Sequence, residues 1–132
     1  MAEYMNWQAI EIGALVPGFV SVNGAIATNV VDDSMRSELI PVVAGESLLV
    51  EVFCPANKRL WERHEWFDSN GSYISDAYYS GSSGSTTSSD RTLQHELTAP
   101  GTAAFIMLSA TQLSANGTIT LYRSGGGWCF NE

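Results

Sequence analysis

One stretch, Ser47-Leu-Leu-Val-Glu-Val-Phe-Cys54, decides the fold class of this chain. Its apolar side chains recur at every second position, while Glu51 takes the opposite face. An alternation of period two is typical of a β-strand that is buried on one face only. The stretch therefore predicts a strand whose inward-facing residues are Leu48, Val50, Val52 and Cys54.

Similar runs of Val, Ile, Leu, Thr and aromatic residues recur along the chain, with Gly, Pro, Asn, Asp and Ser between them. Strands punctuated in this way, with no sustained helical period, indicate an all-β sandwich or barrel. We expect a two-sheet antiparallel β-sandwich of the jelly-roll type. Its nine predicted strands are Trp7–Leu15, Gly18–Ala27, Glu38–Val43, Ser47–Cys54, Leu60–Asp68, Ser72–Asp76, Thr92–Thr98, Ala103–Ala110 and Thr118–Arg123.

Two of these strands carry further positional information. Pro41 predicts an edge position or a strand start, because proline cannot donate a ladder hydrogen bond. Ala103–Ala110 is apolar on both faces, which favours a place in the middle of a sheet.

The length of 132 residues suits one domain. We divide it into an N-terminal strand and attachment segment (1–17), the sandwich (18–123) and a glycine hinge with an aromatic tail (124–132). Trp7, Trp128 and Phe130 are the candidate partner contacts, because large apolar side chains at a flexible end suit docking.

The charge balance excludes some partners. Fourteen acidic residues against six basic ones give a formal net charge of -8. Such a surface repels nucleic acid and anionic lipid, and no apolar run is long enough to insert into a membrane. The first residues lack the pattern of a secretory leader, so either a leader has been removed or the protein is made in a cytoplasm and leaves by another route.

Cofactor signals are weak. Cys54 and Cys129 are too few for a disulfide framework, and either two reduced thiols or one bridge fits them. The two histidines lack neighbours at zinc-ligand spacing. Asp32-Asp33 and the Asp68–Gly71 turn offer oxygen atoms to calcium, but we expect no metal and no cofactor.

A sugar site needs flat aromatic faces beside hydrogen-bonding groups. In Leu60–Asp68, alternation places Trp61 and Arg63 on one face and His64 and Trp66 on the other, and one face should line the core. Both tryptophans could equally be core residues. The candidate glycan-binding residues are Tyr78, Tyr79, Trp61, Trp66, Arg63, His64 and Gln94, with Tyr78 and Tyr79 beside the long polar loop Tyr79–Asp90.

Catalysis has weaker support. Glycosidases use two carboxylates at a set separation, and Glu62, Glu65, Asp68 and Asp76 are the available acids. Scattered acids on solvent faces are expected in so acidic a chain. No serine lies in a nucleophile-elbow motif, so we expect that the protein is not an enzyme.

Four motifs carry a family resemblance: Gly24-x-Ile26; Leu39-Ile-Pro-Val42 with Gly45; Trp66-Phe-Asp-Ser-Asn-Gly-Ser-Tyr-Ile74; and Leu97-Thr-Ala-Pro-Gly-Thr-Ala-Ala-Phe-Ile106. In this order the chain resembles the carbohydrate-binding-module-like jelly-roll domains of bacteriophage tail, baseplate and fibre proteins, over roughly residues 18 to 123.

The resemblance implies a virion component, a tail, fibre or surface-decoration protein, that is made in the host bacterial cytoplasm and binds host or environmental glycan. It also implies other virion proteins as partners and assembly as a homo-oligomer. One alternative is a structural cement protein without glycan binding. Another is a carbohydrate-binding module from a secreted bacterial glycan-processing protein.

Overall fold

The computed structural model describes the backbone of residues 2–28, 31–80 and 86–131, and the side chains of residues 6–28, 31–80 and 86–124. Within these ranges the chain is all-β, apart from the short 3₁₀ turn η1 (Val22–Gly24). The strands are β1 (Ala2–Ile10), β2 (Val16–Pro17), β3 (Phe19–Val20), β4 (Ile26–Ala27), β5 (Met35–Arg36), β6 (Ile40–Pro41), β7 (Ser47–Cys54), β8 (Arg63–Phe67), β9 (Tyr73–Tyr79), β10 (Arg91–Thr98), β11 (Phe105–Met107), β12 (Ser109–Ala110) and β13 (Thr118–Asn131).

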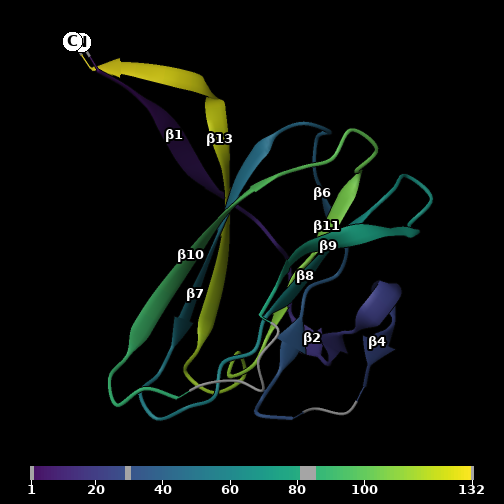
Figure 1. The fold of residues 1–132 in the computed structure, drawn as a ribbon, viewed down its shortest axis with the longest axis vertical. Helices are drawn as coiled ribbons and strands as arrows, with labels where there is room; N and C mark the ends of the chain where they lie inside the picture. Colours follow the sequence, from purple (N-terminus) through teal and green to yellow (C-terminus); the bar gives the residue numbers. More distant parts are fainter. Residues whose placement is uncertain (1, 29–30, 81–85, 132) are drawn as a thin grey trace.

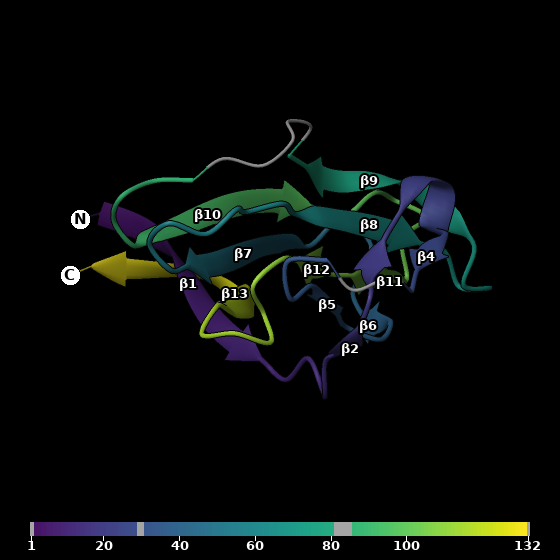
Figure 2. The same cartoon turned by 90° about the horizontal axis from the view of Figure 1, so that it is seen from below.

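Two antiparallel four-stranded sheets form a sandwich (Figure 1). One sheet has the strand order β1-β13-β7-β10, and the other has the order β6-β11-β8-β9. Two small sheets, β12-β5-β2 and β3-β4, complete the fold, and β4 lies on the side of the molecule away from the chain ends (Figure 2). The predicted all-β antiparallel sandwich is confirmed.

The core lies between the two large sheets. Leu48, Val50, Val52 and Cys54 of β7 are all fully buried, so the predicted inward face is confirmed. They belong to one apolar cluster with residues of the opposite sheet, including Trp66. Burying an aliphatic side chain of this size stabilises the fold by about 1.5–3 kcal/mol.

Sheet positions follow the predictions for two segments. Pro41 lies in β6, at the edge of its sheet, where a missing N–H costs no ladder hydrogen bond. The apolar run Ala103–Ala110 does lie mid-sheet, because β11 pairs with β6 on one side and β8 on the other. The run divides, since β12 pairs instead with β5.

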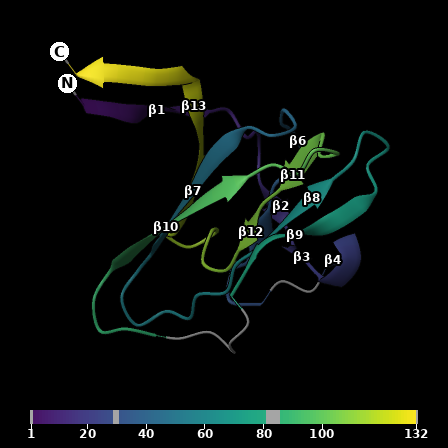
Figure 3. The same ribbon diagram turned by 45° about the horizontal axis from the view of Figure 1, so that its top comes forward.

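Both chain ends differ from their predicted form. The first strand is Ala2–Ile10 rather than Trp7–Leu15, and the glycines predicted as a hinge lie inside β13. The two ends pair with each other along their length, with Ala2 opposite Asn131 (Figure 3). Mutual pairing satisfies backbone groups on both strands, which outweighs the flexibility of glycine. The side chains of Trp128 and Phe130 lie outside the described residues.

The predicted strand Gly18–Ala27 is a hairpin, β3–η1–β4. The chain reverses at Asn23-Gly24, whose φ angles of 59° and 81° lie in the left-handed region that Asn and Gly tolerate. The hairpin packs on β8, so all five residues of β8 are buried although a strand with a free face would alternate. The covered face of β8 is where the candidate site lies.

Candidate ligand-binding site

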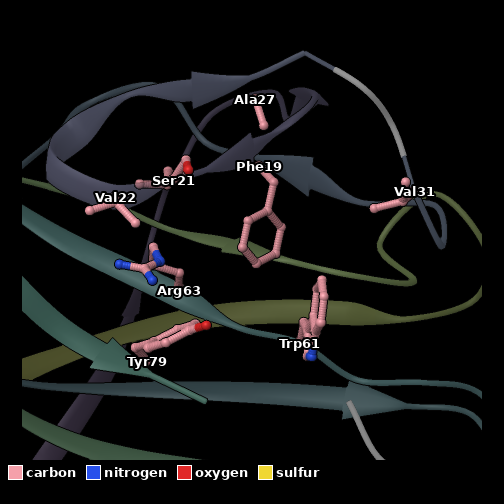
Figure 4. Close-up of a pocket in the computed structure, with 9 residues that line it drawn as sticks. Phe19, Ser21, Val22, Ala27, Val31, Trp61, Arg63 and Tyr79 are labelled. Atoms are coloured by element: carbon pink, nitrogen blue, oxygen red, sulfur yellow. The ribbon is translucent and has the colours of Figure 1, made fainter. Parts of the chain in front are cut away.

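A pocket of about 280 Å³ lies between the β3–η1–β4 hairpin and the strands β8 and β9. Three of its nine lining residues, Trp61, Arg63 and Tyr79, are among the predicted glycan-binding residues. Their side chains face the hairpin across the cavity (Figure 4). The remaining lining residues come from the hairpin and the segment after it: Phe19, Val20, Ser21, Val22, Ala27 and Val31.

The pocket opens onto exposed apolar surface. Within the described ranges, five large hydrophobic residues are exposed, and Val22 (58%), Val31 (50%) and Tyr79 (47%) line the pocket. A fourth, Ile26, lies opposite Val20 in the hairpin. Exposed apolar residues that gather around a concavity are typical of a binding site.

Arg63 is fixed on the floor of this pocket by two carboxylates and an aromatic ring. Its Nη1 lies 3.2 Å from both carboxylate oxygens of Asp76 and 3.4 Å from Glu65 Oε2. Its guanidinium carbon lies 3.8 Å from the ring centroid of Tyr79, its cross-strand partner in β9. The register of β8 with β9 therefore creates the cation–π contact.

Glu65 carries an unusual charge state. Burial raises its pKa to about 7, together with a hydrogen bond to Asp76 and the negative charge of that residue, against the opposing effect of Arg63. Asp76 also accepts a hydrogen bond of 3.1 Å from the Tyr73 hydroxyl. The pocket floor is thus a compact charged network with one cation and two acids.

The opposite face of β8 carries a second buried network. Glu62 accepts hydrogen bonds of 2.9 Å from Nε2 of His64 and from Nε2 of His95. His64 Nδ1 accepts the Ser109 N–H at 3.3 Å, which places the ring proton on Nε2. Tyr78 stacks on His95 with 3.7 Å between ring centroids. His64 is buried and Tyr78 is half-buried against the core, and neither lines the pocket.

Two other predicted glycan-binding residues are also elsewhere. Trp66 is 3% exposed and lies in the core, because it faces β7 rather than the hairpin. Gln94 is exposed on the outer face of β10, where its Nε2 donates to Glu51 Oε2 at 2.7 Å. Neither residue lines the pocket.

The hairpin half of the pocket was missed from sequence because Gly18–Ala27 looks like one strand. The dipeptide Asn23-Gly24 is the signal that could have found it, since Asn-Gly between apolar runs favours a tight turn. The polar loop beside Tyr79 is described only from residue 86, and residues 86–90 are exposed.

The described residues contain no group of three or more His, Cys, Asp or Glu that could hold a metal ion. Of the calcium candidates, Asp32 pairs with Arg59 at 3.8 Å. Asp68 Oδ1 accepts the N–H groups of Asn70 and Ser72, both at 2.9 Å, and so closes its own turn. Cys54 is a free, buried thiol, and the side chain of Cys129 is not described.

Comparison with known proteins gives only distant likenesses. No family model and no curated protein matches the sequence. Among solved structures, the chain is similar to one described as "CBM4 structure and function", with 13% identity and a TM-score of 0.42 over 72% of this chain and 59% of that one.

Two further structures have similar scores. One is the CBM22-1–GH10 part of the xylanase Xyn10B from Clostridium thermocellum, complexed with xylohexaose, at 15% identity and a TM-score of 0.46 over 96% of this chain and 27% of that one. The other is the structure of infectious bursal disease virus, Gt strain, with 14% identity and a TM-score of 0.45 over 96% of this chain and 31% of that one. The chain spans less than two thirds of each of the three. No helix in the described part is long and apolar enough to cross a membrane.

Proposed function

We propose that this protein is a non-enzymatic glycan-binding module whose site is the pocket of Trp61, Arg63 and Tyr79. The observation that carries the proposal is the convergence of exposed apolar and aromatic side chains on one concavity with a fixed guanidinium in its floor. Aromatic faces suit the C–H faces of a pyranose, and Arg63, Ser21 and the Tyr79 hydroxyl suit its oxygens.

The size of the pocket supports a small ligand portion. A volume of about 280 Å³ lies just below the usual range for small-molecule sites, which begins at about 300 Å³. We therefore expect one sugar residue of a longer chain to enter, with the rest lying over the exposed rim at Val22.

The acids near the pocket are engaged in ways that favour binding over hydrolysis. Glu65 and Asp76 both contact one nitrogen of Arg63, Nη1, at 3.4 Å and 3.2 Å. A glycosidase instead separates its two carboxyl groups by about 5 Å or more, with the scissile bond between them. Glu62 is 1% exposed and is held by both histidines.

Replacing Tyr79 with alanine is expected to weaken glycan binding at least ten-fold, because it removes the most exposed aromatic face of the pocket. A glycan array followed by calorimetric titration measures this change. Val43→Ala is the matched control, since Val43 is exposed at 64% and does not line the pocket. Equal binding by the Tyr79→Ala variant and the wild type would refute the assignment of the site.

A second candidate function, attachment to other virion proteins, rests on the outer face of the β1-β13-β7-β10 sheet. Leu49 lies opposite Tyr122 in the register, on the face away from the core, and both are half-buried. Trp7 lies opposite Ser124. Ser124 follows Tyr122 by two residues in β13, so Trp7 and Tyr122 lie on the same face of the sheet. The three form an apolar strip across adjacent strands. Together with the family resemblance, the strip supports a virion component that assembles as an oligomer.

The variant Trp7→Ser tests that candidate. If the strip is an oligomer contact, light scattering should show a multimer for the wild type and a smaller species for Trp7→Ser at the same concentration. A wild-type protein that is monomeric at high concentration would refute the hypothesis that the strip mediates self-assembly. In that case the presence of the chain in purified virus particles, measured by mass spectrometry, decides the virion role.

A further inference from the structure

The pocket has two chemically different ends. The polar groups of the lining, on Ser21, Arg63 and Tyr79, lie toward one end, where Val22 is also found. The other end holds Phe19, Val31 and Trp61 (Figure 4). A ligand that fills both ends must present hydrogen-bonding groups to the first and a small apolar group to the second. A plain hexose has hydroxyl groups around its whole rim, and burying these against apolar side chains leaves them without partners.

The cations near the pocket are already neutralised. Nη1 of Arg63 contacts both Asp76 and Glu65, so the floor of the pocket has no surplus positive charge. Arg59, whose guanidinium carbon lies 5.4 Å from the Trp61 ring centroid, pairs with Asp32. The protein as a whole carries a net charge of -8. Both observations disfavour a carboxylated or sulfated sugar.

We infer that the pocket selects a neutral sugar residue that carries a methyl group, such as a 2-acetamido sugar or a 6-deoxy sugar. The methyl group lies against Phe19, Val31 and Trp61, while the ring hydroxyls accept hydrogen bonds at the Arg63 end. This inference rests on the proposed function and adds the class of sugar.

Matched pairs of methyl glycosides test the inference by NMR titration. Methyl N-acetylglucosaminide is compared with methyl glucoside, and methyl L-fucoside with methyl L-galactoside, so that each pair differs in one substituent. Methyl glucuronide tests the effect of charge. At least one methyl-bearing sugar is expected to bind about ten-fold tighter than its partner, which is a typical penalty for a missing apolar group, and the glucuronide is expected to bind most weakly. The pair that shows this difference in affinity identifies whether the methyl group belongs to an acetamido group or to a 6-deoxy sugar.

Two variants at the apolar end give the matching protein test. Val31→Asp places a charge where the methyl group is expected, and its binding of the preferred sugar should fall at least ten-fold. Val31→Thr keeps the shape and should reduce the preference within the pair. Val43→Asp is the control for an exposed valine elsewhere and should bind as the wild type does.

The possible failures are distinguishable. If the two members of each pair bind with affinities within two-fold of each other, or if the glucuronide binds best, the proposed class of sugar is wrong. The proposed glycan site is not contradicted by that result. Unchanged binding by Val31→Asp would also overturn the proposed class of sugar. If none of the five glycosides and no glycan on the array binds to the folded protein, both the inference and the proposed function fail.

Discussion

Replacing Glu62 with glutamine is expected to lower the free energy of unfolding at neutral pH by about 1–3 kcal/mol. The carboxylate is 1% exposed, and each of its oxygens accepts a hydrogen bond from a different histidine. An amide supplies one acceptor oxygen and turns an N–H₂ group toward the second ring N–H. One buried donor then loses its partner in the core of the sandwich.

The pH dependence of this effect has a definite sign. Burial by itself raises the pKa of Glu62, but the hydrogen bonds and charges of His64 and His95 together lower it to about 2. A carboxyl group with a lowered pKa contributes its stabilisation above the ordinary value of 4.5 and loses it as the pH falls toward 2. The gap between wild type and Glu62→Gln should therefore narrow below pH 4.5.

Urea denaturation at several pH values measures that gap. Glu51→Gln is the matched control, because Glu51 is half-buried on the outer face of β7 and contacts only Gln94 among the described hydrogen-bond partners. Its change should stay within about 0.5 kcal/mol. A Glu62→Gln variant as stable as the control would show that the two histidines do not depend on the carboxylate.

Replacing Glu65 with glutamine is expected to stabilise the protein at pH 8 by up to about 3 kcal/mol. The pKa of Glu65 is raised from 4.5 to about 7, so the folded state holds a proton that the unfolded state has released. The free energy of unfolding therefore decreases as the pH rises from 4.5 to about 7. Glutamine keeps an acceptor for Arg63 and has no proton to lose.

The difference between the two unfolding curves isolates this one group. It should be near zero at pH 4 and should grow between pH 4.5 and about 7, where Glu65 ionises in the folded protein. Glu96→Gln, at an exposed position of β10, is the control and should parallel the wild type. A constant difference across the range would mean that Glu65 is ionised throughout, and the account of the pocket floor would be wrong.

Local alternation explains why some of the fold could be predicted. In β7, every second residue is apolar and every one of these is buried, since one face of the strand meets the core and the other does not. The edge position of Pro41 followed from its missing N–H. Both inferences need only the residues of the strand itself.

The site depends on contacts between different strands, which the residue pattern within one strand does not predict. Arg63 and Glu65 are charged residues of a kind that usually lies in solvent, but the β3–η1–β4 hairpin covers β8 and buries them. The partner of Arg63, Asp76, comes from a different strand. Likewise, Glu62 depends on His95 of β10. Trp61, Arg63 and Tyr79 were nevertheless recognised as aromatic and hydrogen-bonding residues, and the fold brings these three together.

The most direct test of the proposed binding site is an ¹⁵N–¹H NMR titration of the protein with methyl N-acetylglucosaminide and methyl L-fucoside. The proposal predicts that the shifted signals come from Phe19–Ala27, the Trp61 indole and Tyr79, around one pocket. Shifts confined to the outer face of the β1-β13-β7-β10 sheet, around Gln94 and Tyr122, would contradict it and move the site to the other side of the sandwich.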